Sequence, residues 1–261
     1  MKRPDWAVPL GILVGLATIC AGAWIEGVRI GFLWQPAAAL IVFGGTLGAL
    51  LVRRGVDGLR VLARAFLSLF FQPGKEEMEA TKARLTWLAR LVRREGAQAL
   101  EAQAATVNDP LLAQALSLIS QYADSAIVRD RLERVLDHED ERGLRDVTTL
   151  EGAASYAPTF GILGAVLGLI QVLRALSDPS SLGLGIATAF VATIYGVGVA
   201  NLILFPLAAR LRERHSYYMR QREAIAAALI SLAAHETPGV VTRTFMADME
   251  LTLRQDKVAL R

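Results

Sequence analysis

Long uncharged stretches alternate with charge-rich stretches along this chain. Four of the uncharged stretches cover residues 6–25, 30–52, 152–173 and 179–209. About 20 helical residues cross a hydrocarbon core of about 30 Å, and each of the four stretches reaches that length. The pattern therefore predicts a membrane protein with four transmembrane helices.

The polar stretch between the second and third spans has helical periodicity. Apolar residues recur at helical spacing over 56–70 with Arg60 and Arg64 on another face, which predicts a helix lying against lipid headgroups. Breaks at 72–74 and at Gly96, and the helix-start sequence at 108–110, separate further expected helices. These helices are expected at 75–95, 98–106, 111–122 and from 127 into the third span. Since no alternating pattern of useful length appears, the fold class is predicted as all-α.

Basic residues gather on one side of the predicted spans. Lys2 and Arg3 precede the first span, four arginines at 53–64 follow the second, and three at 210–214 follow the fourth. Because basic residues accumulate in cytoplasmic connections, both termini are expected in the cytoplasm. The charged residues in the other two connections are only Glu26 and Arg29, between the first and second spans, and Arg174 and Asp178, between the third and fourth.

The expected division of the chain follows from these spans. Residues 1–54 hold transmembrane helices 1 and 2, and residues 55–151 form a helical cytoplasmic domain. Residues 152–211 hold transmembrane helices 3 and 4, and residues 212–261 form a cytoplasmic C-terminal tail. No small-residue cleavage site follows Ala23, so the first apolar stretch is interpreted as a retained helix.

Composition disfavours several functional classes. The chain is 53% hydrophobic and only 20% charged, with a net charge of +3, which disfavours a soluble enzyme or a nucleic-acid binder. Cys20 is the single cysteine, so no disulfide framework or cysteine metal cluster is expected. The three histidines lie apart without ligand spacing, and no nucleophile, base and orienting group are grouped. We therefore expect neither enzymatic activity nor a metal or other cofactor.

The predicted spans contain no Asp, Glu, Lys or Arg. Charges inside a membrane usually mark ion paths, so an ion-conducting function would need a carboxylate from another polypeptide. A membrane scaffold that conducts nothing would show the same absence, and composition leaves both alternatives open.

Other residues of the spans indicate helix packing and bending. Gly161, Gly164 and Gly168 recur at helical spacing and allow another helix to approach closely. Pro158 and Pro206 lie near the inner ends of the third and fourth spans, which predicts a hinge or widened cavity at one depth.

Four stretches resemble the MotA/PomA family, the A subunits of the flagellar motor stator. Residues 156–170 and 192–211 are similar to its third and fourth membrane helices, and residues 40–49 to its second. The sequence Arg-Arg-Glu-Gly-Ala-Gln-Ala-Leu-Glu at 93–101, with Asn-Asp-Pro at 108–110, resembles its cytoplasmic loop. These stretches follow one another in the family's order over nearly the whole chain.

The resemblance implies an ion-driven torque generator in the bacterial inner membrane. It implies a pentamer of this chain around a dimer of a single-span, MotB-like subunit, whose aspartate binds the ion. Thr193 matches the hydroxyl that faces the ion path, with Tyr195 nearby, and Pro158 and Pro206 match the prolines that couple ion occupancy to movement. Arg93, Arg94 and Glu101 match residues that contact the rotor protein FliG, although Ala102 and Ala104 replace further acidic residues of relatives.

Three departures from sodium-driven relatives indicate the ion. Ala165 and Ala192 stand where those relatives carry threonines, and Gln35 where they carry an aspartate. Sodium needs several oxygen ligands, whereas a proton needs one titrating group and a water path. The missing oxygens therefore favour protons.

Two related systems and one unrelated class remain as alternatives. An energiser of the ExbB/TolQ type shares the helix pair but has three spans and an outside N-terminus. Stator-like subunits of phage defence typically carry a longer cytoplasmic extension. A scaffold or receptor without conduction would give no proton flux with a B-type partner.

Overall fold

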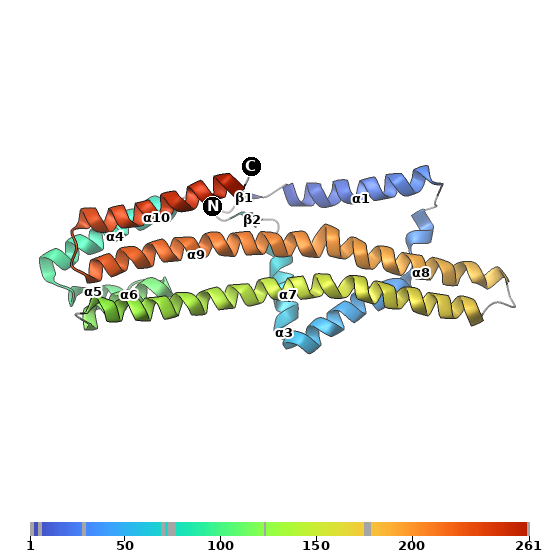
Figure 1. The fold of residues 1–261 in the computed structure, drawn as a ribbon, viewed down its shortest axis with the longest axis horizontal. Coiled ribbons are helices and arrows are strands. Elements are labelled where there is room, and N and C mark those ends of the chain that lie inside the picture. The colour runs from blue at the N-terminus through green and yellow to red at the C-terminus, as the bar shows by residue number, and fades with distance from the viewer. Residues whose placement is uncertain are drawn as a thin grey trace. The chain divides into compact units, whose positions relative to one another are not determined.

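The computed structural model describes residues 3–4, 7–27, 30–68, 71–72, 77–122, 124–174 and 179–259 of the chain. Lys2, Arg29, Asp178 and the expected break at Pro73 and Gly74 lie outside these residues. The described part is almost entirely helical, as predicted (Figure 1). Two short strands, β1 (Arg3–Pro4) and β2 (Phe71–Gln72), also occur among the described residues and pair in antiparallel orientation.

The helices follow one another with short connections. The N-terminal half contains α1 (Ala7–Ile25), η1 (Ile30–Leu33), α2 (Pro36–Ala39), the π-helix η2 (Leu40–Gly44), α3 (Gly45–Ser68), α4 (Glu77–Glu95), α5 (Ala99–Ala104) and α6 (Pro110–Gln121). The C-terminal half contains α7 (Ser125–Arg174), α8 (Pro179–Val199), the π-helix η3 (Ala200–Leu204), α9 (Phe205–Ala233) and α10 (Pro238–Ala259).

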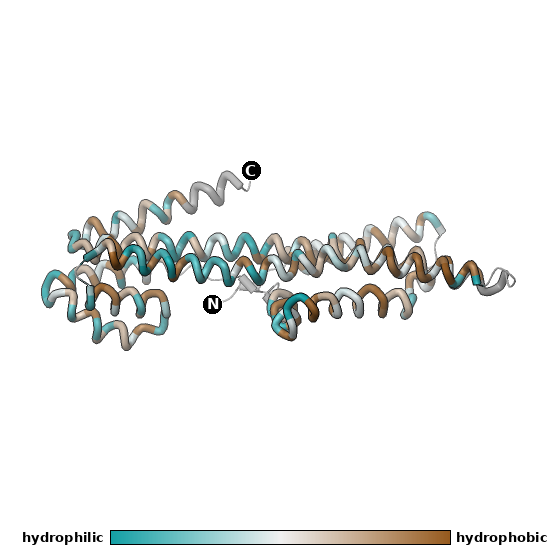
Figure 2. The backbone as a smooth tube through the Cα atoms, turned by 60° about the horizontal axis from the view of Figure 1, so that its bottom comes forward, coloured by the Kyte–Doolittle hydropathy of each residue, from teal (hydrophilic) through white to brown (hydrophobic). Residues whose placement is uncertain are grey.

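Four helical segments of the described chain are long and apolar enough to cross a membrane, which confirms the predicted number of spans. They are Ala7–Ile25, Pro36–Leu67, Ser125–Arg174 and Gly185–Ala233. The last two extend beyond the apolar stretches because span and polar helix continue without interruption, whereas Pro36–Leu67 continues past a bend at Gly55. Figure 2 shows this as a change of hydropathy along single helices. The chain is therefore an integral membrane protein.

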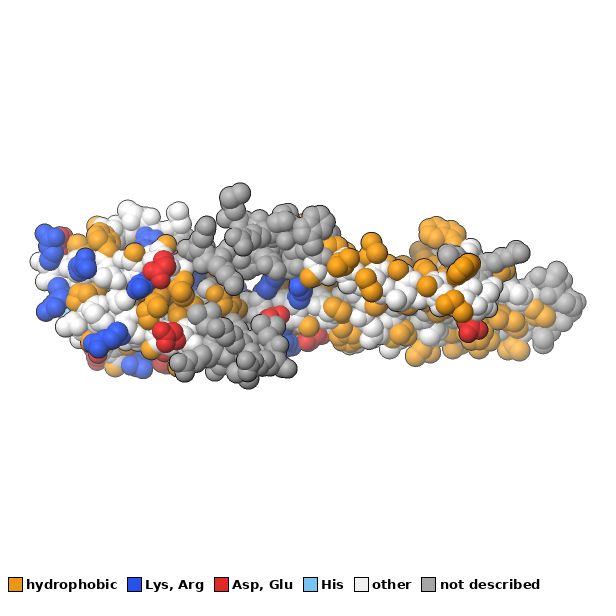
Figure 3. All heavy atoms as spheres, turned by 90° about the horizontal axis from the view of Figure 1, so that it is seen from above, with side chains coloured by type: hydrophobic (Ala, Val, Ile, Leu, Met, Phe, Trp, Pro, Cys, Tyr) orange, Lys and Arg blue, Asp and Glu red, His pale blue; other side chains and the backbone are white. Residues whose placement is uncertain are grey.

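The chain divides into two compact units. The span unit comprises residues 1–73 and 145–212, and the polar unit comprises residues 74–144 and 213–261. Hydrophobic side chains dominate the surface of the span unit that is visible in Figure 3, whereas Lys, Arg, Asp and Glu gather on the polar unit. An apolar surface suits lipid or a partner subunit, and a charged surface suits water.

In the span unit, α3 bends sharply at Gly55, whose φ of 61° and ψ of −156° are not helical. Glycine adopts this conformation readily because it lacks a Cβ. The bend separates the second span from the predicted headgroup helix. Beside it, Arg54 donates hydrogen bonds to the Thr149 hydroxyl and the Arg145 carbonyl, both at 3.0 Å, and Arg212 pairs with Glu151 at 2.8 Å.

The polar unit has its own hydrophobic core between α4, α5, α6, α7, α9 and α10. Gly96, with φ of 85°, ends α4, and Asp109 caps α6 by accepting from the Leu111 and Leu112 amides. Both signals were predicted from the sequence. Within the residues expected as the C-terminal tail, α9 and α10 contribute Leu229, Phe245 and other buried side chains to this core. Their buried apolar positions recur at helical spacing, which is the signal in the sequence that could have predicted this packing.

Candidate functional site

Helices α7 and α8 meet along a line of small residues, which we call the glycine seam: Gly161, Gly164 and Gly168 on α7 and Gly185 and Gly196 on α8. A Cβ on Gly161 would lie 2.9 Å from the Ala192 carbonyl oxygen, and a Cβ on Gly168 would lie 2.7 Å from the Ala189 nitrogen. Side chains are therefore excluded there by backbone atoms. The helices of spans three and four touch at van der Waals distance along the seam.

Substitution in the seam should loosen this helix pair. Gly168→Leu would force α8 away, because its closest neighbours are backbone atoms rather than flexible side chains. We expect a loss of about 1–3 kcal/mol, the range for overpacked sites, measured as a lower apparent melting temperature of the purified complex. Gly183→Leu is the matched control, since a Cβ on Gly183 meets nothing within 4 Å. Equal melting temperatures for the two variants would contradict close packing at Gly168.

The residues expected at the ion path occupy different environments. Ala192 is fully buried against Gly164 and packs with Ala38 and Val42 at the start of the second span. Thr193 is half-buried, and its hydroxyl donates to the Ala189 carbonyl at 3.4 Å. Ala165 is also half-buried, on α7. Of these three positions, Thr193 alone carries a hydroxyl. Its hydrogen bond to the Ala189 carbonyl is long, so the hydroxyl can form a hydrogen bond with another group instead.

Tyr195 connects α8 to the beginning of the second span. Its hydroxyl donates to the Leu33 carbonyl and accepts from the Gln35 amide at 3.4 Å, and its ring lies 6.0 Å from that of Phe43. The structure thus gives Tyr195 a positioning contact that its sequence neighbourhood did not indicate. Gln35 takes part through its backbone.

Both prolines predicted as hinge points lie inside helices. Pro158 interrupts the hydrogen bonding of α7, since its nitrogen cannot donate to the Ala154 carbonyl. Its Cα lies 3.1 Å from where a Cβ on Gly196 would stand, so Gly196 allows α8 to pass this weakened turn. Gly196 is not among the glycines predicted for helix packing, although it lies in the motif at 192–211.

Pro206 lies two residues after the end of a π-helical turn, η3. Within η3 the register has shifted, and the Phe205 amide bonds to the Ala200 carbonyl five residues earlier. A π-turn is a natural accommodation of a missing proline N–H, and such turns are frequent at functional sites. A second π-turn, η2, lies in the second span, where the buried Thr46 hydroxyl donates to the Val42 carbonyl at 2.6 Å.

The residues expected to contact the rotor lie in the polar unit. Arg93 and Arg94 are exposed at the end of α4. Glu101 is exposed on α5, but its carboxylate also accepts hydrogen bonds from Ser117 and Ser120 of α6. The serines were not predicted, because nothing in the sequence shows which helix packs beside Glu101. They fix the direction in which the carboxylate points.

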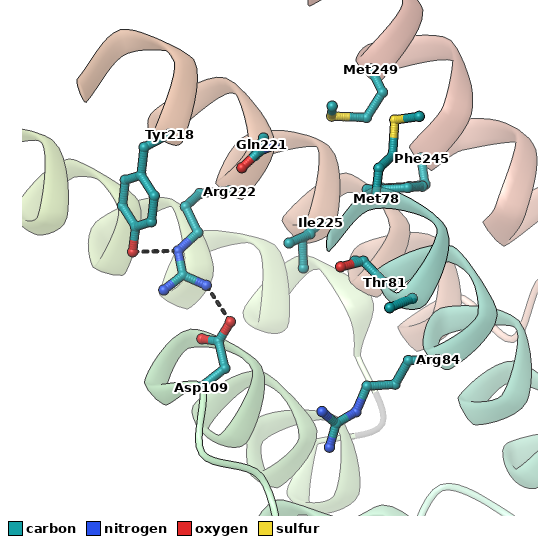
Figure 4. Close-up of a pocket in the computed structure, with 11 residues that line it drawn as sticks. Met78, Thr81, Arg84, Asp109, Tyr218, Gln221, Arg222, Ile225, Phe245 and Met249 are labelled. Atoms are coloured by element: carbon teal, nitrogen blue, oxygen red, sulfur yellow. Dashed lines mark hydrogen bonds and ion pairs between the residues drawn. The ribbon is translucent and has the colours of Figure 1, made fainter. Parts of the chain in front are cut away.

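A polar network links the α6 cap to α9 (Figure 4). Arg222, with only 9% of its side chain exposed, donates to Asp109 at 2.5 Å and to the Tyr218 hydroxyl at 2.7 Å. Glu139 lies 3.4 Å away. Burial alone would lower the pKa of Arg222, but the hydrogen bond from Arg222 to Asp109 and the negative charge of Asp109 outweigh this effect and raise it. Burial also raises the pKa of the Tyr218 hydroxyl. A cavity of about 440 Å³ adjoins this network.

Fold and site together define a class of protein: a four-span membrane subunit whose spans lack carboxylates and whose polar helices form a separate unit. Residues 103–224 match the MotA/TolQ/ExbB proton channel family, and residues 9–97 match the motility protein A N-terminal family. Together with two relatives that are at least 30% identical over more than nine tenths of the chain, these matches show that the chain belongs to the motility protein A family.

Individual relatives agree with this assignment. Motility protein A of Treponema phagedenis is 31% identical, covering 93% of both chains. Motility protein A of Treponema pallidum (strain Nichols) is 30% identical, covering 97% of this chain and 96% of its own. The flagellar MotAB stator complex from Bacillus subtilis is similar in structure, with a TM-score of 0.77 and 28% identity over 92% of this chain and 94% of that chain.

Proposed function

We propose that this chain is the A subunit of a flagellar motor stator, which couples inward proton flow across the bacterial inner membrane to torque on the rotor. The similarity of nearly the whole chain to motility protein A relatives and to a solved MotAB stator complex carries the proposal. Because its spans contain no carboxylate, the chain needs a partner that supplies the titrating group. The match of residues 9–97 to the motility protein A N-terminal family favours a stator over an ExbB/TolQ-type energiser. Both termini are then cytoplasmic, and no catalysis is assigned to the chain.

The partner is a MotB-like single-span subunit, present as a dimer inside a pentameric ring of this chain. The solved relative is a complex of MotA with MotB, which supports such a partner. Protonation of the partner's aspartate near Thr193 changes its hydration and lets the ring advance. Ala165 and Ala192 add no further oxygen ligands. The membrane potential supplies about 2.3 kcal/mol per charge per 100 mV.

In this function, Pro158 and Pro206 allow the helices to bend as the ring advances, and the polar unit pushes the rotor protein FliG. Arg93, Arg94 and Glu101 form the contact, with Ser117 and Ser120 orienting the glutamate. Exposed ion pairs contribute only about 0–1 kcal/mol each. Weak pairs suit a contact that must form and break at every step.

Reconstitution in vesicles tests the proposal. The purified chain alone should leave a proton gradient intact, whereas the chain with its B-type partner should dissipate it. Replacement of the partner's membrane aspartate by asparagine should abolish the flux. Vigorous dissipation by the chain alone would overturn the proposal, and absence of flux from the complex would favour a scaffold.

Ion choice gives a separate prediction. Cells that depend on this stator should swim at full speed in sodium-free medium, because the chain lacks hydroxyls at Ala165 and Ala192. A collapse of the proton gradient should stop them. Swimming speed against sodium concentration, at constant ionic strength, is the measurement. A strict sodium requirement would refute the proton assignment.

A further inference from the structure

Three hydrogen bonds tie the inner end of the second span to α7. Arg54 donates from Nε to the Thr149 hydroxyl and from Nη2 to the Arg145 carbonyl, both at 3.0 Å. The Thr149 hydroxyl in turn donates to the same carbonyl at 2.6 Å. The three groups therefore form a closed ring between two helices of the span unit, which we call the Arg54 clamp.

The clamp requires an arginine on one side and a hydroxyl on the other. Both acceptors are neutral, so the contact depends on the directions of the donors rather than on an opposite charge. The planar guanidinium presents two donors in a fixed fork, which a lysine ammonium does not. Thr149 is only 1% exposed, so water cannot readily replace Arg54 at its hydroxyl.

The neighbouring contact between the second span and α7 is apolar and smooth. Leu50 is fully buried and packs with three alanines of α7, Ala153, Ala154 and Ala157. Hydrophobic contact has no preferred direction, and alanine methyl groups offer little relief against sliding. The apolar contact therefore holds the two helices together, while the hydrogen bonds of the clamp fix their register.

Helix α3 holds the same turn of α7 again beyond its bend. Gly55 follows Arg54 directly and carries the non-helical conformation that bends α3 (Figure 1). After the bend, Val61 and Ala65 lie in one buried cluster with Leu150 of α7, the residue next to Thr149. This turn of α7 therefore cannot move far without carrying α3 and its headgroup helix along.

The clamp lies at an informative place along α7. Pro158 weakens the hydrogen bonding of α7, and residues 145–149 lie between this proline and the polar residues at the beginning of the helix. A movement that starts at Pro158 must therefore pass through the clamped turn to reach the polar part of α7. If α7 could slide along the second span there, part of the movement would be lost.

We propose that Arg54 is a positioning residue for torque. It fixes α7 to the second span, so that bending at Pro158 drives the polar part of α7 instead of sliding the two helices past each other. Gly55 provides the bend that lets the headgroup helix follow. The inference rests on the proposed function, and it places no part of Arg54 in the ion path.

Two conservative substitutions test the clamp in the full complex with its B-type partner. Arg54→Lys keeps the charge but loses the fork, and Thr149→Val keeps the shape but loses the hydroxyl. Loss of a hydrogen bond to a charged group shifts the equilibrium between clamped and free helices about tenfold or more. Each variant should therefore swim severalfold more slowly, with proton flux into vesicles unchanged. The double variant should be no slower than the slower single variant, because both changes break one contact.

Matched controls are available on the same helices. Arg60→Lys makes the same change at an exposed arginine that pairs with Asp57, and it should alter neither swimming nor flux. Thr148→Val removes an exposed hydroxyl that also donates to the Arg145 carbonyl, at 3.0 Å, and should be equally silent. Thr149→Ser retains the hydroxyl that Arg54 needs and should swim like the wild type.

The ratio of swimming speed to proton flux separates positioning from a merely structural role. Wild-type swimming by Arg54→Lys or by Thr149→Val would overturn the clamp and leave the proposed function standing. A parallel loss of flux and swimming, or loss of the co-purifying partner, would assign Arg54 to assembly and also overturn the inference. Equal slowing by Thr148→Val would do the same. A wild-type complex that neither conducts nor supports swimming would overturn the proposed function itself.

Discussion

Replacing Pro206 by alanine is expected to abolish swimming while the complex still assembles. The new N–H could donate to the Leu202 carbonyl, and the π-turn at Ala200–Leu204 would relax to regular α-helix. The backbone hydrogen bonds would then no longer be shifted by one residue, and the helix would be stiffer at the point where the fourth span bends. Pro158→Ala should act in the same direction, since it restores the bond to the Ala154 carbonyl. Swimming speed, with co-purification of the partner as the assembly measurement, checks both variants.

Pro9→Ala provides the matched control. Pro9 lies in the first turn of α1, where an N–H has no partner inside the helix, so its replacement should leave swimming unchanged. Full swimming by both Pro158→Ala and Pro206→Ala would reject the hinge role. Failure of the partner to co-purify would show that the prolines serve assembly instead.

Replacing Arg222 by methionine is expected to loosen the polar unit more than any other single substitution outside its apolar core. Methionine fills similar space but leaves the Asp109 and Glu139 carboxylates without their shared cation. Breaking a buried ion pair by removing one partner lowers the free energy of unfolding by about 3–5 kcal/mol. Because both carboxylates are partly exposed, we expect a loss at the lower end, about 3 kcal/mol. Because Asp109 also caps α6, that helix should open first.

Hydrogen exchange of the purified complex measures this effect locally. The amides of α6 and of the adjoining turn of α9 should lose protection in Arg222→Met, roughly a hundredfold for about 3 kcal/mol. Arg134→Met is the control, because Arg134 and Asp130 form an exposed pair on α7 in the same unit. Equal exchange in both variants would show that the buried pair does not hold α6.

Part of the candidate site could be predicted because its signals are local. Gly96 and the helix start at Asp109 appear where expected, since a left-handed glycine and a capping aspartate act within one turn of chain. The number of spans follows from length and hydropathy alone. The kink at Gly55 likewise falls between the expected span and headgroup helix.

Contacts between distant segments could not be predicted in this way. The partners of Tyr195 and Glu101 come from helices whose neighbours the sequence does not specify. A helical period shows which face of a helix is apolar, but not which helix covers it. For the same reason, the sequence predicts residues 212–261 only as a cytoplasmic tail, whereas the structure shows that α9 and α10 contribute buried side chains to the core of the polar unit.

The sequence by itself determined that this protein spans a membrane four times with no charge in its spans, because hydropathy and charge are properties of each residue taken alone. It also supplied the motifs by which the family could be recognised. The tertiary structure decided the pairing of the glycine seam and the ion pair of Arg222. Each of these depends on which helices pack together, and packing is settled by the shapes of all the side chains at once.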